Sequence, residues 1–195
     1  MKRLTVILVL LFCLNSFAEI SLGVNLQTFF NNSHIDEIQE RTTRDFNFSI
    51  VPSLIIVPSD RLEIVPFIGY SSSNSWEYDA DGDKISESSL SGVYMGAGLF
   101  FRLFKVKPIR FSFGPQVHFT PFWNDFFREY NFGVSAPVNI DLLFSDAFFV
   151  RMSASIISIY LGITDYDDNY DRGKTSFSTA ISTQVTPSMG FFFTF

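Results

Sequence analysis

Apolar and polar residues alternate with a period of two along most of the chain. In IRFSFGPQVHFT (109–120), positions 109, 111, 113, 117 and 119 are apolar, whereas the even positions include Arg110, Ser112 and His118. Residues 89–103 repeat the pattern. Successive side chains of a strand point to opposite faces of its sheet, so this alternation predicts β-strands with one apolar face and one polar face.

The links between the predicted strands alternate in length. The expected strands are 20–30, 44–57, 62–73, 89–103, 109–120, 130–144, 148–162 and 175–195. Short links fall at 58–61, 105–108 and 145–147, and long polar links fall near 31–43, 74–88, 121–129 and 163–174. Short turns at one end and long loops at the other are typical of bacterial outer-membrane barrels. The predicted fold class is all-β: an eight-stranded antiparallel up-and-down transmembrane β-barrel with both termini at the periplasmic end.

A soluble barrel or sandwich would show the same alternation, and the placement of charge separates the two interpretations. The solvent face of a soluble sheet normally carries many Lys and Glu residues. Here Lys84, Lys105, Lys107 and Lys174 fall in predicted loops or turns, and the polar strand faces are mostly Gly, Ser, Asn, Gln and Thr. This favours a polar, filled lumen inside an apolar exterior that faces lipid.

The first residues have the pattern of a secretory signal peptide. MKRLTVILVLLFCLNSFA begins with basic residues, continues with an apolar stretch that is too short to span a bilayer, and ends on the small residue Ala18. We predict a signal peptide over 1–18 and an outer-membrane β-barrel domain over 19–195. The one cysteine, Cys13, lies inside the signal peptide, so the mature chain is expected to have no disulfide.

Composition narrows the class of partner. The 195-residue chain has a net charge of −6 and 25 Phe residues. Proteins that bind nucleic acid carry basic faces, so the acidic balance argues against a nucleic-acid partner. After the signal peptide, no apolar run reaches the roughly 20 residues of a membrane helix, so the apolar residues must be organised in strands.

The chain ends in SMGFFFTF, which carries a recognisable motif. Ser188, Gly190, Phe193 and Phe195 match the polar, any, glycine, any, any, aromatic, any, aromatic pattern of the C-terminal assembly signal of outer-membrane barrels. With this motif and its strand layout, the mature chain resembles the small eight-stranded outer-membrane barrels of the OmpA and OmpX type. The resemblance implies a location in the cell outer membrane, contact with its lipid and lipopolysaccharide, and recognition of the last strand by the barrel assembly machinery.

Five charged residues close to the short turns occupy strand positions whose side chains point to the polar, inner face of the predicted barrel. They are Glu63, Arg102, Arg110, Asp141 and Arg151. An eight-stranded barrel is just wide enough to be filled by its side chains, and an isolated buried ion is very costly. We therefore predict a cross-strand ionic network that fills the lumen near the periplasmic end. A gated conduction path through this network is the alternative.

His118 has the inward phase near the long-loop end, where barrel enzymes that modify lipopolysaccharide carry a histidine. Catalysis would need a nucleophile or water within hydrogen-bond reach of the imidazole. No lipase-like motif surrounds His118, so we favour a hydrogen-bonding role in the lumen.

Two features concern the loops and the ladder. Asp79, Asp81 and Asp83 are weak candidates for a calcium site, because the glycine follows the second acid and breaks the EF-hand spacing. A solvated acidic loop is favoured.

Prolines inside the expected strands have no N–H to donate to the hydrogen bonds between strands, so we expect them at bulges or opened ladder positions. These prolines are Pro52, Pro66, Pro115, Pro137 and Pro187.

Together these patterns predict an integral outer-membrane barrel with a structural or surface-interaction role through its long extracellular loops. A narrow pore for ions or small solutes is the alternative, and a lipid A-modifying enzyme centred on His118 is a third hypothesis that we favour less. No cofactor is predicted, and a monomer is favoured.

Overall fold

The computed structural model of the chain describes residues 19–34, 42–123, 127–166, 175–182 and 186–195. These residues form ten strands in one antiparallel sheet. The strands are β1 (Glu19–His34), β2 (Thr42–Ser59), β3 (Leu62–Tyr78), β4 (Lys84–Val106), β5 (Ile109–Phe113), β6 (Gln116–Trp123), β7 (Phe127–Leu143), β8 (Phe148–Tyr166), β9 (Thr175–Ser182) and β10 (Thr186–Thr194). The described part of the chain contains no helix that is long and apolar enough to cross a membrane. The predicted signal peptide, residues 1–18, lies outside the described residues.

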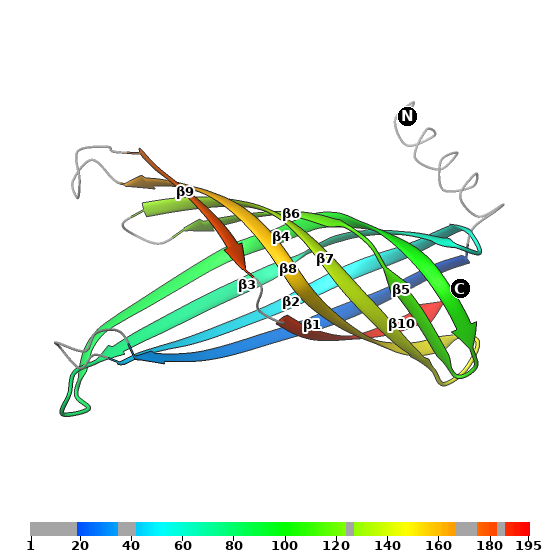
Figure 1. Cartoon of the computed structure of the whole chain (residues 1–195), viewed down its shortest axis with the longest axis horizontal. Helices are drawn as coiled ribbons and strands as arrows, with labels where there is room; N and C mark the ends of the chain where they lie inside the picture. Colours follow the sequence, from blue (N-terminus) through cyan, green and yellow to red (C-terminus); the bar gives the residue numbers. More distant parts are fainter. Residues whose placement is uncertain (1–18, 35–41, 124–126, 167–174, 183–185) are drawn as a thin grey trace, which may run out of the picture.

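The sheet curves until its last strand pairs with its first (Figure 1). Strands β1 to β4 pair in sequence order, β7 pairs with β8, and β10 pairs with both β8 and β1. The β1–β10 ladder joins Ser21–Gln27 to Ser188–Thr194. Within the described strands, the rest of β1 pairs with β2 alone, so the two edges meet along only part of β1. The space on the concave side of the sheet is called the lumen below.

The sheet has ten strands where the sequence predicts eight, because two expected strands are interrupted. Strands β5 and β6 replace the single expected strand 109–120, and both lie between β4 and β7. The break falls at Gly114 and Pro115, where proline has no N–H to donate. Strands β9 and β10 replace the expected strand 175–195, and residues 183–185 between them are not described.

The other prolines behave in two ways. Pro137 lies beside a register shift in the β7–β8 pairing, as the expectation of bulges requires. Pro52, Pro66 and Pro187 instead keep regular register positions in β2, β3 and β10. None of these three lies at a bulge. Pro52 and Pro66 do fall in gaps of the β2–β3 ladder, which lacks pairs between Ile50 and Ser53 and between Ser53 and Ile56 of β2, so they occupy the opened ladder positions that were the other expectation.

The β3–β4 hairpin is longer than the sequence predicts. Most of the expected loop 74–88 is strand, because β3 continues to Tyr78 and β4 begins at Lys84. Lys84 and Lys105 therefore belong to β4 and not to loops. The hairpin projects well beyond the body of the sheet at the long-loop end (Figure 1).

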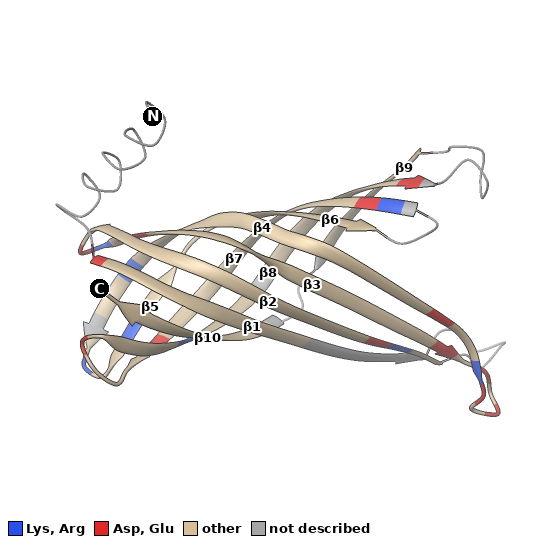
Figure 2. Cartoon of the chain, turned by 180° about the vertical axis from the view of Figure 1, so that it is seen from behind, with Lys and Arg blue, Asp and Glu red and all other residues tan. Residues whose placement is uncertain are grey.

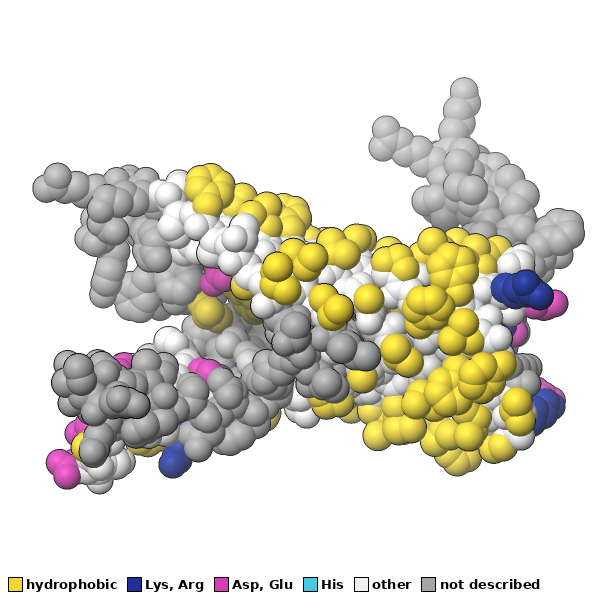
Figure 3. All heavy atoms as spheres, viewed as in Figure 1, with side chains coloured by type: hydrophobic (Ala, Val, Ile, Leu, Met, Phe, Trp, Pro, Cys, Tyr) yellow, Lys and Arg dark blue, Asp and Glu magenta, His cyan; other side chains and the backbone are white. Residues whose placement is uncertain are grey.

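The two faces of the sheet differ in chemistry. Charged residues gather toward the two ends of the strands and leave a long middle stretch without charge (Figure 2). Large apolar side chains cover much of the outer surface (Figure 3). Outward side chains such as Leu103, Ile68 and Val117 are 60%, 59% and 53% exposed, whereas Glu63 and Asp141, which point into the lumen, are buried.

Candidate functional site

A cluster of charged side chains lies in the lumen beside the short turns. Glu63, Arg102, Arg110, Asp141 and Arg151 come from β3, β4, β5, β7 and β8, and the structure brings all five together. The Nε atoms of Arg110 and Arg151 donate to the two Asp141 oxygens at 2.7 and 2.6 Å. Glu63 accepts from Arg102 Nε and from Arg151 Nη2, both at 2.7 Å. Two carboxylates therefore hold three guanidinium groups.

Glu19 is a sixth member that the sequence analysis does not include. Its Oε1 atom lies 3.7 Å from Arg102 Nη2 and 3.5 Å from Arg110 Nη1. With Glu19, three carboxylates face three guanidinium groups, so the side chains of this six-residue group, called the ionic cluster below, carry no net charge. A signal for Glu19 exists, because it shares the inward phase of Ser21 two residues later.

The guanidinium groups of two arginines lie over the faces of aromatic rings. The Phe149 and Phe192 rings stack with centroids 5.2 Å apart. The Arg110 Cζ atom lies 4.8 Å from the Phe149 centroid, and the Arg151 Cζ atom lies 5.7 Å from that of Phe192. Contacts of a guanidinium group with a ring face stabilise the charge where water is excluded.

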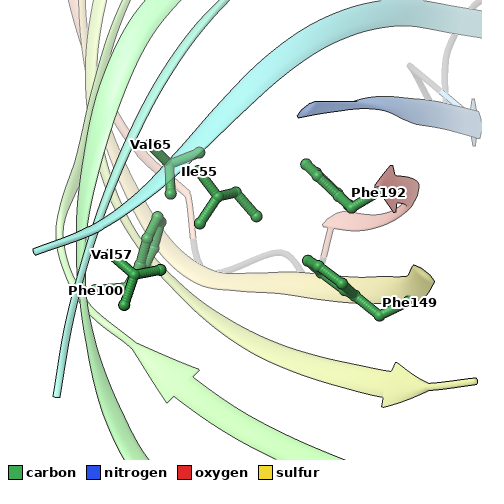
Figure 4. Close-up of a cluster of buried hydrophobic side chains, with 6 residues drawn as sticks. All are labelled: Ile55, Val57, Val65, Phe100, Phe149 and Phe192. Carbon is green, nitrogen blue, oxygen red and sulfur yellow. The ribbon is translucent and has the colours of Figure 1, made fainter. Parts of the chain in front are cut away.

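Figure 4 shows a layer of six buried apolar side chains, which meets the ionic cluster where Arg110 and Arg151 contact the rings of Phe149 and Phe192. Its members are Ile55, Val57, Val65, Phe100, Phe149 and Phe192. The sequence predicts small polar groups on the inner faces and does not predict this layer. On β2 the reason is that both faces are apolar, since Leu54 and Ile56 alternate with the inward Ile55 and Val57.

Farther from the short turns, the lumen holds a cavity of about 100 Å³. A row of rings from β3, β4, β6 and β8 crosses its wall, with successive centroids 5.1, 5.2 and 5.5 Å apart. The row consists of Phe67, Tyr94, His118 and Tyr160. Serine side chains form much of the remaining wall, namely Ser53, Ser135, Ser153, Ser155, Ser158 and Ser188.

His118 lies in this row and is 8% exposed. Its register partner in β7 is Gly133, where an added Cβ would collide with the imidazole, so the glycine provides the space for the ring. The Nδ1 atom has no hydrogen-bond partner. No serine or carboxylate of the described residues is therefore bonded to Nδ1 in the way that an activated nucleophile or a catalytic base requires.

The acidic tip of the β3–β4 hairpin is organised by its own backbone. Asp79 Oδ1 accepts the N–H groups of Asp81 and Asp83 at 3.1 and 2.8 Å. Gly82 has a φ of +84°, which glycine adopts without strain. No group of three or more His, Cys, Asp or Glu side chains in the described ranges could hold a metal ion. The Asp79 carboxylate therefore has a structural role in this turn.

The four residues of the C-terminal motif lie on or next to β10. Phe193 and Phe195 are 55% and 85% exposed on the outer face. The ring centroids of Phe193 and Phe148 lie 5.0 Å apart. Ser188 lines the lumenal cavity, and Gly190 is buried on the inner face. The motif thus presents aromatic rings outward and small residues inward.

Comparisons with known proteins give only distant likenesses. No family model matches the chain, and no curated protein matches it. Among solved structures, a major outer membrane protein from Thermus thermophilus aligns with a TM-score of 0.49 and 11% identity, covering 91% of this chain and 99% of that one. The translocator domain of autotransporter NalP from Neisseria meningitidis aligns with a TM-score of 0.35 and 8% identity, covering 91% of this chain and 86% of that one. The outer membrane protease OmpT from Escherichia coli aligns with a TM-score of 0.28 and 8% identity, covering 91% of this chain and 93% of that one. All three TM-scores lie below 0.5, so these likenesses do not decide the function of this chain.

Proposed function

We propose that the chain is an integral outer-membrane protein whose residues 19–195 form an eight-stranded antiparallel up-and-down transmembrane β-barrel. Residues 1–18 act as the signal peptide for export. In this interpretation β5 with β6 forms one strand of the barrel, and β9 with β10 forms another. Each pair shares a neighbour across its break, and the pairing of β10 with β1 supports a closed ring. Closure matters because lipid offers no partner for free backbone N–H and C=O groups.

The outward apolar surface is the observation that carries the proposal. Among the described residues, 30 large hydrophobic side chains are exposed and only eight hydrophobic side chains are buried. A soluble protein of this size would bury most of its large apolar groups and would not expose a continuous apolar face. A lipid bilayer removes the cost of this exposure, and an apolar band between charged ends is the pattern of a transmembrane barrel (Figures 2 and 3).

The packed lumen favours a structural or surface-interaction role over conduction. The ionic cluster is neutral, its four most buried members are at most 3% exposed, and the apolar layer packs against it. A narrow pore for ions or small solutes would need these hydrogen bonds to break. We therefore assign the role to the long-loop end, where the β3–β4 hairpin projects, with outer-membrane lipid and lipopolysaccharide as the surroundings. The unpartnered Nδ1 of His118 gives no support to a lipid A-modifying enzyme.

Planar-bilayer recordings test this role against the pore. Residues 19–195 are refolded in detergent, folding is shown by circular dichroism, and currents are recorded for the wild type, Arg102→Ala and Arg110→Ala. The exposed Arg61→Ala, at the β2–β3 turn, is the matched control. We expect no unitary conductance from folded wild type. Stable wild-type conductance that changes in the two cluster variants, and not in Arg61→Ala, would establish the pore instead.

A further inference from the structure

Each of the five prolines in the expected strands lies beside an interruption of the pairing between strands. Pro52 and Pro66 lie in the two gaps of the β2–β3 ladder. Pro115 lies in the break between β5 and β6, and Pro137 lies beside the register shift of the β7–β8 ladder. The β1–β10 ladder ends at the residue next to Pro187. The five residues are called the proline belt below.

The proline belt encircles the lumenal cavity. Pro137 lines the cavity, and so does at least one chain neighbour of each other proline, namely Val51, Ser53, Val65, Phe67, Gln116 and Ser188. The pairing agrees with a common level, because Ser155 of β8 pairs with Pro137 and the adjoining Ala154 pairs with Pro187. The N–H of Gly114, next to Pro115, donates to the Pro137 carbonyl at 3.4 Å.

The sheet is weakly held together at the level of the belt. Proline has no N–H, so each member removes one donor from the hydrogen bonds between strands. In the proposed membrane barrel, lipid offers no replacement for a missing partner. The lumen at this level holds the cavity and not a packed core. Segments with few backbone hydrogen bonds and few packing contacts are the ones that open most readily.

Between the belt and the short turns, side chains in the lumen hold all strands together. The ionic cluster connects β1, β3, β4, β5, β7 and β8. The apolar layer adds β2 through Ile55 and Val57 and β10 through Phe192. Every strand that passes through this half therefore contributes to one packed group, so we expect this half to be rigid.

On the other side of the belt, the described strands divide into two arms, β1–β4 and β6–β9. Strands β4 and β6 pair as far as Ser91 and Trp123, beyond which the described part of β4 pairs with β3 alone. Beyond Gln27, the described part of β1 pairs with β2 alone. The ends of the two arms lie apart at the long-loop end (Figure 1). Few contacts would therefore oppose a movement of one arm against the other.

We propose that the proline belt is a hinge at which the two arms pivot, while the half that contains the ionic cluster stays rigid. The cavity at the level of the belt provides free volume for this movement. The loops at the ends of the arms then change their separation without disturbing the plugged half. This inference rests on the proposed membrane barrel and adds a movement to its loop-bearing end.

Distances between spin labels test the hinge. Residues 19–195 contain no cysteine, so pairs of introduced cysteines can carry nitroxide labels. The chain is refolded in detergent micelles, and double electron–electron resonance gives the distribution of each distance. Ser88→Cys in β4 with Asp165→Cys in β8 reports on the arms, and Arg61→Cys with Asp146→Cys reports on the short turns; all four residues are exposed. We expect a broad distribution for the arms and a narrow one for the turns.

Replacing prolines of the belt should restrict the movement. Pro52→Val and Pro66→Val, made together, return two N–H groups to β2 and β3. The distribution for the arms should then narrow toward the width found for the short turns. Pro58→Val is the matched control, because Pro58 is an exposed residue of β2 near its short turn and outside the belt. It should leave the distribution for the arms unchanged.

Three results would overturn the proposal. Equal widths for the two label pairs in the wild-type background would show a rigid barrel, and this comparison needs no proline variant to fold. A distribution for the arms that stays as broad with Pro52→Val and Pro66→Val would place the movement outside the belt. Equal narrowing by Pro58→Val would show a general effect of proline. A barrel that is silent in bilayers and has two equal widths would keep the proposed function and lose only the hinge.

Discussion

At the scale of single residues, Asp141 is the carboxylate on which the ionic cluster depends most. It is 1% exposed and accepts hydrogen bonds from both Arg110 and Arg151. Taking ions out of water is expensive, and the cost is offset only while each charge keeps its partner. A neutral side chain at position 141 would leave two buried guanidinium groups facing the remaining carboxylates.

We therefore predict that Asp141→Asn strongly destabilises the protein. Breaking a buried pair from one side costs about 3–5 kcal/mol, which urea unfolding in detergent micelles would report as a lower midpoint. Asp146→Asn is the control, because Asp146 pairs with Lys107 on an exposed turn at 3.4 Å and should shift the midpoint little. Equal midpoints for the two variants would contradict a stabilising role of the cluster.

The inward phase of each charged residue follows from the sequence, but its partners do not. Alternation places Glu63 and Arg151 on the inner face, while their 2.7 Å contact joins residues 88 positions apart and depends on the curvature of the sheet. Phe149 and Phe192 escape prediction for another reason. Each sits in a run of phenylalanines, where both phases are aromatic and the period of two gives no signal.

At the scale of the strands, the short gap between β5 and β6 combines the missing N–H of Pro115 with a close approach of Gly114 to β4. A Cβ at Gly114 would collide with the Leu99 carbonyl oxygen of β4, which is backbone and cannot rotate away. Pro115 is exposed and contributes its carbonyl, which accepts the Leu99 N–H at 2.9 Å. Any residue at position 115 can supply that carbonyl.

Gly114→Ala should accordingly cost about 1–3 kcal/mol, the usual range for overpacking, whereas Pro115→Ala should cost less than about 1 kcal/mol through the freer unfolded chain. Urea midpoints of the two variants, measured side by side in the same micelles, check the order. The reverse order would mean that the rigid ring of Pro115, and not the close approach at Gly114, fixes this part of the sheet.

Strand β10 carries the proposed assembly signal, and its outward rings allow a matched test. Phe193→Ala and Phe195→Ala should lower the amount of folded protein in the outer membrane of expressing cells, because the assembly machinery loses its aromatic contacts. Phe191→Ala is the control, since Phe191 is also outward, 42% exposed, but outside the motif. All three variants should refold alike in detergent. If Phe191→Ala lowered the amount of folded protein in cells equally, the effect would come from the hydrophobicity of the strand in general and not from the motif.

Strand ends are the part of these elements that the sequence predicts least well. The alternation of β3 and β4 fades at SSSNSWEY and KISESSLS, although both segments are paired. In the proposed barrel these segments lie beyond the bilayer, where water wets both faces of a strand, so neither face needs to be apolar. Polar cross-strand bonds replace the missing signal, as between Ser75 and Asp45 at 2.7 Å and between Ser89 and Asn74 at 2.9 Å.

At the scale of the whole molecule, the long-loop end and the short-turn end should face different compartments. The β3–β4 hairpin is far longer than a bilayer requires, because about 9–11 tilted residues span the hydrocarbon core and β4 has 23. The ionic cluster lies at the opposite end, beside the short turns. In bacterial outer-membrane barrels the short turns are periplasmic and the longer loops extracellular.

Cysteine labelling checks this orientation, because the chain has a single cysteine, Cys13, within the predicted signal peptide. Asp81→Cys, at the tip of the β3–β4 hairpin, should react with a membrane-impermeant maleimide on intact cells. Asp146→Cys, in the exposed β7–β8 turn, should react only after the outer membrane is permeabilised. The unsubstituted chain measures background and should remain unlabelled in the membrane fraction. If Asp146→Cys alone were labelled on intact cells, the barrel would have the opposite orientation. Equal labelling of both variants on intact cells would contradict a transmembrane arrangement.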